Sequence, residues 1–144
     1  GGHFYLINEI GSKVIHYRCA GGAMTLCGEV STLPEGFAGE NICSDLHITP
    51  DGRYLYASNR GHDSIAAYRV QPDGGLVWLD CRSSGGRTPR NFAVDPTGRW
   101  LLAGNQDSDN ITVFAIGEDG RLSQGRSFEF GSPVCIRFFH KTQF

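Results

Sequence analysis

A block of residues that repeats along the chain constrains the fold more than any other feature of this sequence. Residues 44–70 recur without a gap at residues 90–116, which is 46 positions later. About two-thirds of the block also recurs 51 positions upstream. The two full copies each contain a glycine turn, Pro-Asp-Gly-Arg at residues 50–53 in the first of them. Because a unit of this size cannot bury its own apolar faces, successive units must pack against one another.

Each repeat unit is predicted to form four short antiparallel strands joined by tight turns. Along the third strand of every copy, core-type residues recur at every second position, which is typical of a strand. The two complete units are expected to have strands at residues 45–49, 54–58, 64–70 and 76–82, and at residues 91–95, 100–104, 110–116 and 122–128. The upstream unit starts at a second strand, residues 3–7. Residues 133–139 resemble a first strand that lacks the other three.

Four-stranded units with a period in the forties are typical of β-propeller blades. We therefore predict an all-β fold, a partial β-propeller with about three four-stranded antiparallel blades. Residues 1–144 form one propeller fragment, with blade-equivalents at approximately 1–30, 44–82 and 90–128 and a closing first strand at 133–139. Closed propellers have about four to eight blades, so we expect a piece of a longer protein or an assembly of copies. Unpaired sheet edges favour self-association of such a fragment.

The composition excludes several classes of partner. The chain has 13 Lys and Arg against 15 Asp and Glu, so it offers no electrostatic attraction to nucleic acid or to an anionic membrane. No apolar run is long enough to suggest a membrane span. The five cysteines form no C-x-x-C pair, so we expect no metal and no cofactor. Widely spaced thiols and the lack of a signal peptide favour the cytoplasm.

Loop residues and strand residues together resemble one known family. The matching stretches are residues 7–9, 32–37, 45–53, 58–64, 88–92 and 104–109. They resemble the seven-bladed propeller lactonases, which include the propeller-type 6-phosphogluconolactonase and the fungal carboxy-muconate cyclase. The resemblance covers essentially the whole chain and corresponds to the C-terminal two-fifths of such a protein, since seven units need roughly 320 residues. It implies a sugar lactone as substrate, 6-phosphoglucono-δ-lactone first of all, and four further blades that contribute to the site.

The candidate site lies at one rim of the predicted channel. In a propeller, the loops between second and third strands and the loops between blades open on the same rim, where convergent polar groups are the default site. Arg60 stands where the other copies have Glu9 and Gln106. Arg90 stands where the central copy has Ser44. A guanidinium suits a phosphate or carboxylate, so Arg60 is a candidate for substrate binding and Arg90 a candidate catalytic residue that also polarises the ester carbonyl, with an inter-blade ion pair as the alternative for both.

Four further residues complete the candidate site. Glu40 lies in a longer inter-blade loop, residues 31–43, and is a candidate acid or base; the alternative is a solvated loop carboxylate. His47 is a candidate general base, although an Asp45–His47 pair that braces two blades explains it equally well. His62 and Gln106 lie on rim loops and are candidates for substrate binding.

These residues lead to one functional hypothesis and two rivals. We expect a sugar-lactone hydrolase in which Glu40 or His47 activates water while Arg60 and Arg90 hold the substrate. A muconate-type lactonising cyclase would use the same arginines for carboxylates. A non-catalytic propeller that serves as a binding scaffold is the rival from another class, because fold alone does not give function. The isolated fragment is expected to be inactive or poorly active.

Overall fold

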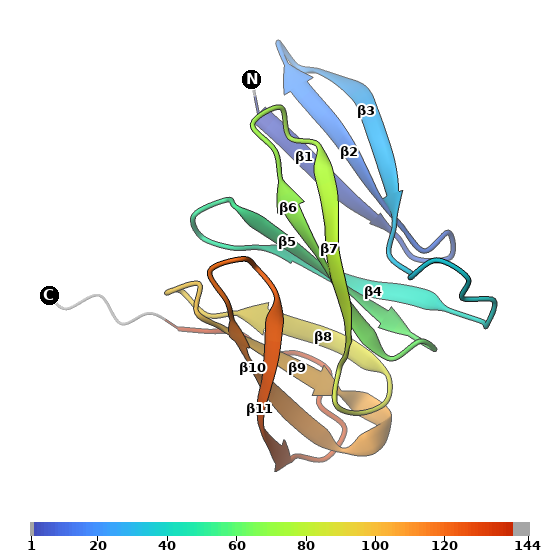
Figure 1. Ribbon diagram of the computed structural model, residues 1–144, viewed down its shortest axis with the longest axis vertical. Helices are drawn as coiled ribbons and strands as arrows, with labels where there is room; N and C mark the ends of the chain where they lie inside the picture. The colour runs from blue at the N-terminus through green and yellow to red at the C-terminus, as the bar shows by residue number, and fades with distance from the viewer. Residues whose placement is uncertain (1, 140–144) are drawn as a thin grey trace, which may run out of the picture.

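A computed structural model describes residues 2–139, which form eleven β-strands and one short 3-10 helix. The strands make three antiparallel sheets in which chain neighbours pair with one another (Figure 1). Sheet one contains β1 (Gly2–Asn8), β2 (Lys13–Ala20) and β3 (Ala23–Ser31). Sheet two contains β4 (Ile42–Ile48), β5 (Tyr54–Arg60), β6 (Ser64–Val70) and β7 (Leu76–Ser83). Sheet three contains β8 (Pro89–Val94), β9 (Trp100–Asn105), β10 (Asn110–Ile116) and β11 (Leu122–Glu129), with η1 (Gln106–Ser108) after β9.

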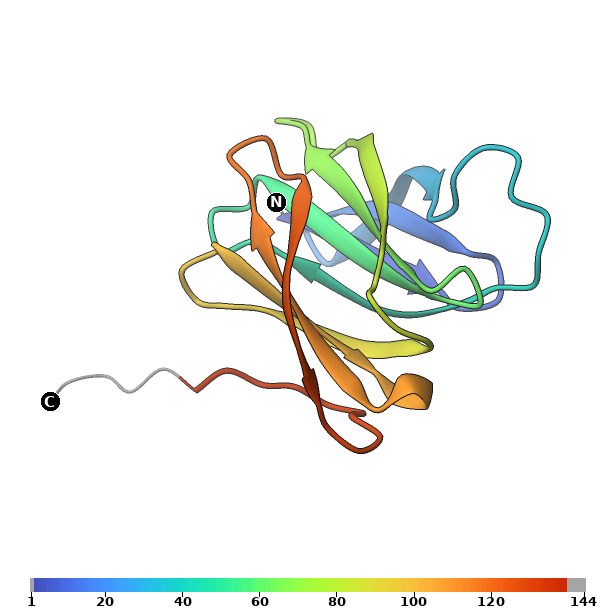
Figure 2. The ribbon, with the colours of Figure 1, turned by 60° about the horizontal axis from the view of Figure 1, so that its bottom comes forward.

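The all-β architecture expected from the repeat is confirmed, and the three sheets follow one another in a fan (Figures 1 and 2). The turns form where the sequence places them. Gly52 and Gly98 adopt φ angles of +73° and +70°, which only glycine reaches without strain. The amide of each closes its turn by donating to a carbonyl three residues earlier, at 2.8 Å and 2.9 Å.

Sheet two lies between the other two sheets, so both of its faces are buried. Every residue of β5 except Arg60 is buried. The core between sheets one and two contains Val14, Leu55, Ala57, Ala66 and Tyr68. The core between sheets two and three contains Tyr54, Tyr56, Ile65, Ala67, Phe92, Leu101, Ala103, Phe114 and Leu122. Burial on both faces explains why a strand such as β5 carries few charges.

A tyrosine hydrogen bond links each sheet to the next at equivalent positions of the repeat. The Tyr5 hydroxyl donates to the carbonyl oxygen of Gly74, in the β6–β7 turn, at 2.7 Å. The Tyr56 hydroxyl, 51 positions later, donates to the carbonyl oxygen of Gly120, in the β10–β11 turn, at 2.8 Å. Gly74 and Gly120 are themselves 46 positions apart. The sequence repeat is therefore also a repeat of sheet-to-sheet contacts.

Residues 133–139, predicted as a closing first strand, have no regular secondary structure in this chain. A strand needs a hydrogen-bonding partner, and no described strand pairs with this segment. The segment nevertheless contacts sheet three in the same way that β8 contacts sheet two. The Ile136 amide donates to Asn91 Oδ1 at 2.5 Å, just as the Phe92 amide donates to Asp45 Oδ2 at 3.3 Å.

The two outer faces of the fan carry exposed apolar side chains. Sheet one exposes Phe4, Leu6, Met24 and Leu26, with Met24 66% exposed, and sheet three exposes Trp100 and Phe128, with Phe128 52% exposed. The equivalent faces of sheet two are buried by a neighbouring sheet. Each outer face is therefore suited to pack against another sheet.

Candidate functional site

The candidate site is a polar hollow at one end of the strands. It has a volume of about 500 Å³, and its lining includes Glu9, Ser44, Asp45, Arg60, Arg90 and Asn91. These residues come from the end of β5, the residue after β1 and the first halves of β4 and β8. A second hollow of about 610 Å³ shares Arg60 and is also lined by Glu40, Asn41, Thr88 and Asp107. Of the predicted residues, Arg60 lines both hollows, Arg90 lines only the first and Glu40 lines only the second.

Arg60 is held in place from two sides. Its Nη2 donates to Glu9 Oε1 at 2.5 Å and to the carbonyl oxygen of Cys43 at 2.9 Å. The Arg60 side chain is only 14% exposed, whereas that of Glu9 is 62% exposed. Its Nε is buried and has no hydrogen-bond partner among the described residues. Arg60 therefore forms the inter-sheet ion pair that the sequence left open as an alternative, and its guanidinium is fixed at the wall shared by the hollows.

Arg90 differs from Arg60 because only its backbone is held. The Arg90 amide donates to the carbonyl oxygen of Thr88 at 2.7 Å, and Ser44 Oγ donates to the Arg90 carbonyl oxygen. Within residues 2–139 the guanidinium makes no ion pair, and the residue is exposed. A cation without a partner at the wall of a polar hollow is available to an anionic or carbonyl-bearing ligand.

Asp45 joins the first strands of two sheets. Its Oδ2 accepts hydrogen bonds from His47 Nε2 at 3.0 Å and from Asn91 Nδ2 at 2.5 Å, besides the Phe92 amide. Burial raises the pKa of the Asp45 carboxyl, but the hydrogen bond and charge of the His47 imidazole, with the Phe92 and Leu46 amides, outweigh burial and lower the pKa below its ordinary value. Asp45 therefore remains ionised and ties β4 to β8.

His47 lies apart from the other candidates. Besides its bond to Asp45, its ring meets the Phe92 ring edge to face, with centroids 4.9 Å apart. It lines a separate hollow of about 250 Å³ with Pro50 and Pro96. Asp45, two residues earlier on β4, lines the polar hollow, but His47 itself does not. Its contacts are those of the blade-bracing alternative.

Glu40 is exposed at the edge of the second hollow. The Glu40 carbonyl oxygen lies where a Cβ of Gly61 would stand, and Gly61 adopts a φ of +115°. Only glycine permits this approach between the long inter-sheet loop and the β5–β6 loop. The position of the loop backbone at Glu40 depends on that contact.

His62 and Gln106 line neither polar hollow. The His62 Nδ1 hydrogen-bonds to Ser64 Oγ at 2.7 Å, and its ring contacts the edge of Phe37 with centroids 4.7 Å apart. Gln106 begins η1, and its amide donates to the carbonyl oxygen of Thr88 at 2.9 Å. Both residues support rim loops in this structure. Asp107 takes the wall position instead, where its Oδ2 accepts a hydrogen bond from Thr88 Oγ1 at 2.6 Å.

The sequence also contains signals for two wall residues that are not among the six candidates. Glu9 and Arg60 occupy the same position of successive repeats with opposite charges, which predicts an ion pair between neighbouring rims. Asn91 occupies the repeat position of Asp45, and the two side chains do bond to each other. Ser44 gave no such signal. No group of three metal-binding side chains is placed to hold an ion in the part of the chain that the structure describes.

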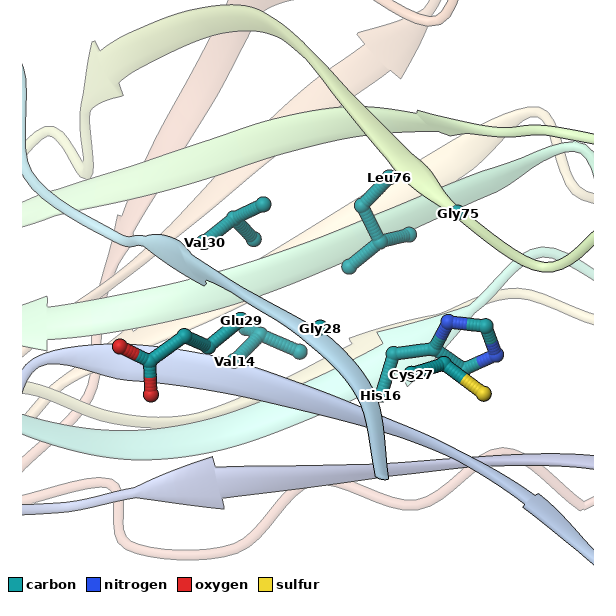
Figure 3. A pocket seen from close by; sticks show the side chains of 8 residues that line it. All are labelled: Val14, His16, Cys27, Gly28, Glu29, Val30, Gly75 and Leu76. Atoms are coloured by element: carbon teal, nitrogen blue, oxygen red, sulfur yellow. The ribbon is translucent and has the colours of Figure 1, made fainter. Parts of the chain in front are cut away.

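A further hollow of about 200 Å³ lies between sheets one and two (Figure 3). It is lined by β2, β3 and the β6–β7 turn, including His16, Cys27 and Glu29. It shares no lining residue with the polar hollows. It lacks the converging charged groups of the Arg60 site, so we do not include it in the candidate active site.

Comparison with known proteins decides the family. The protein family described as "Lactonase, 7-bladed beta-propeller" matches residues 1–138 of this chain. The chain belongs to this lactonase family. Within it, the chain is 37% identical over 94 residues to a 6-phosphogluconolactonase of Bacillus subtilis, a match covering 63% of this chain and 27% of that protein. Among solved structures, the periplasmic gluconolactonase of Pseudomonas aeruginosa superposes with a TM-score of 0.90 and 34% identity, over 96% of this chain and 39% of that one. A putative 6-phosphogluconolactonase of Bacteroides fragilis gives 0.87 and 34%, over 96% and 39%.

Membership of the lactonase family confirms the partial seven-bladed propeller predicted from the repeat. The chain spans about a quarter of the length of the curated relatives it matches and about two-fifths of the solved chains. The sequence predicts that the chain is the C-terminal part of a longer lactonase. The comparisons do not support this, because they do not place the chain clearly at the C-terminal end. No helix within residues 2–139 could cross a membrane. One structural relative is periplasmic, so a cytoplasmic location stays a prediction.

Proposed function

We propose that the protein built around this chain hydrolyses a sugar lactone at the wall shared by the two polar hollows. The observation that carries the proposal is the pair of arginines that line the first hollow, Arg60 fixed by Glu9 and Arg90 without an ion-pair partner within residues 2–139. Relatives of comparable similarity are named 6-phosphogluconolactonase and gluconolactonase, which supports the same substrate class. The convergence of charged groups in a hollow favours an enzyme over a flat binding scaffold.

The two arginines have different tasks in this proposal. Arg90, which lines the first hollow and makes no ion pair within residues 2–139, binds the negative charge that develops on the lactone carbonyl oxygen or an anionic substituent of the sugar. Arg60 is too constrained to follow a ligand, because Glu9 and the Cys43 carbonyl oxygen hold it. It supplies a rigid wall against which the substrate is oriented.

Glu40 is the better-placed base. It lines the hollow that reaches Arg60, whereas His47 lines another hollow and is committed to Asp45. In the proposed step Glu40 takes a proton from water, and the water oxygen adds to the carbonyl carbon of the lactone. The bond from that carbon to the ring oxygen then breaks, and the ring oxygen receives the proton. The product is the open hydroxy acid, and no covalent enzyme intermediate is formed.

The test uses the protein with its complete ring of blades. Arg90→Ala and Glu40→Gln are each expected to lower the enzymatic rate of lactone hydrolysis by about 100-fold, the usual cost of removing a transition-state contact. Arg121→Ala is the matched control, because Arg121 is an exposed arginine that pairs locally with Asp119. Proton release measures the rate. Wild-type rates in both Arg90→Ala and Glu40→Gln would refute the site, and turnover of a muconate instead of a lactone would assign the cyclase reaction.

A further inference from the structure

Two sheet-to-sheet contacts in this chain are built on the same plan but with different side chains. Between sheets two and three, the Tyr54 ring packs against Gly120 and the Tyr56 hydroxyl bonds to its carbonyl oxygen. Between sheets one and two, the place of Tyr54 is taken by His3 and the place of Tyr56 by Tyr5, each 51 positions earlier. The first contact contains no group that titrates near neutral pH. The second contains a histidine pair.

The second histidine is His16, which stands 51 positions before Ala67. His3 Nδ1 and His16 Nε2 lie 2.9 Å apart, and the two ring centroids are 5.0 Å apart. The His16 ring stacks on Tyr5 at 5.1 Å and is only 6% exposed. Both of the paired nitrogens lie where a Cβ of Gly74 would stand, His16 Nε2 at 2.6 Å. The pair therefore lies directly beneath the β6–β7 turn.

One hydrogen bond between two imidazoles requires an N–H on one ring and a lone pair on the other. If both rings are protonated, two N–H groups and two positive charges face each other at this distance, and the rings must separate. His16 has room to move, because it lines the hollow of about 200 Å³ between sheets one and two (Figure 3). Movement of either ring disturbs the support of Gly74 and its bond to Tyr5.

Other charged groups near the pair do not cancel this effect. Burial is the main cause of a lowered pKa of His16, the neighbouring His3 lowers it further, and Asp73 of the turn opposes both without overcoming them. Glu29 of β3 lines the same hollow but is paired with Lys13. The remaining titratable neighbours are Tyr5, whose pKa is raised by burial, Cys27 of β3 and the exposed Arg18 on the same side of β2.

We propose that the His3–His16 pair makes the contact between sheets one and two a pH-sensitive latch, closed at neutral pH and loosened in acid. A group whose folded pKa is depressed binds protons more readily in the opened state. Its contribution to stability is complete above the ordinary histidine pKa of about 6.5 and is lost as the pH falls through the lower folded pKa. The equivalent contact between sheets two and three stays closed over the same range, because tyrosine and alanine replace the pair.

Hydrogen–deuterium exchange tests the latch within one molecule. After correction for intrinsic rates, amides of the turn at residues 71–75 are expected to exchange several-fold faster at pH 5 than at pH 7.5. Amides of the equivalent turn at residues 117–121 are expected to keep their protection. Equal responses of the two turns, or no response of the first, would overturn the proposal.

A double variant tests the cause. His3→Tyr with His16→Ala installs the residues of the equivalent contact and is expected to abolish the acid response of residues 71–75. A variant that keeps the response would show that the histidines are not its source. If the double variant does not fold, NMR titration of the wild-type rings replaces it. Coupled titration of His3 and His16 in two steps supports the latch, and independent titration at the ordinary pKa refutes it.

Discussion

The packing of one sheet on the next can be tested at a single glycine. Gly120 adopts a φ of +82°, and a Cβ added to it would lie 2.4 Å from Cε1 of the Tyr54 ring. Gly120→Ala therefore has two costs, about 1–2 kcal/mol for a left-handed residue with a side chain and about 1–3 kcal/mol for overpacking. The expected loss in the free energy of unfolding is about 2–5 kcal/mol.

Gly21→Ala separates the two costs. Gly21 also has a positive φ, +58°, but its added Cβ would meet nothing within 4 Å. The expected loss is therefore the backbone cost alone, about 1–2 kcal/mol. Urea unfolding of both variants, monitored by fluorescence and circular dichroism, measures the difference. If Gly120→Ala loses no more stability than Gly21→Ala, the β10–β11 turn does not press against sheet two, and the stacked arrangement is wrong.

Three further predictions follow from named contacts. Tyr56→Phe leaves the buried Gly120 carbonyl without its donor and is expected to cost about 1–3 kcal/mol in urea unfolding, whereas an unchanged midpoint would exclude the inter-sheet hydrogen bond. Asp45→Asn is expected to cost about 1.5–3 kcal/mol at neutral pH. Because the folded pKa of Asp45 is lowered, its contribution is present above the ordinary carboxyl pKa and is lost as the pH falls through the folded pKa, so the variant should flatten the acid side of the stability profile; a parallel profile contradicts this. The 144-residue chain is expected to self-associate through its exposed outer faces, and Trp100→Glu should weaken this in sedimentation, where a monodisperse wild-type monomer would contradict the expectation.

The repeat predicted the strands well because each unit carries its own turn chemistry and alternation. β6 and β10 begin and end at the residues expected from the sequence, 64–70 and 110–116. Residues 133–139 form no strand within the described part of the chain, for a reason that local sequence does not contain. A first strand is defined by its ladder partner, and no described strand offers one.

The site was harder to predict than the fold because rim position does not fix side-chain partners. Arg60 and Arg90 are both candidates as residues that break the repeat, yet among the described residues Arg60 is paired and Arg90 is not. The opposite charge at the repeat position of Arg60, in Glu9, was the signal for that pairing. His47 was chosen for its chemistry, but distance along β4 places it in a different hollow from Glu40.

The central claim is that Arg90 is the ligand-binding cation of a shared polar rim. A crystal structure of the protein with its full ring, soaked with the hydroxy acid product, tests it directly. The account predicts a product oxygen within hydrogen-bonding distance of the Arg90 guanidinium, in the hollow that Arg60 also lines. Product bound elsewhere, with Arg90 ion-paired to an adjoining blade, would contradict it.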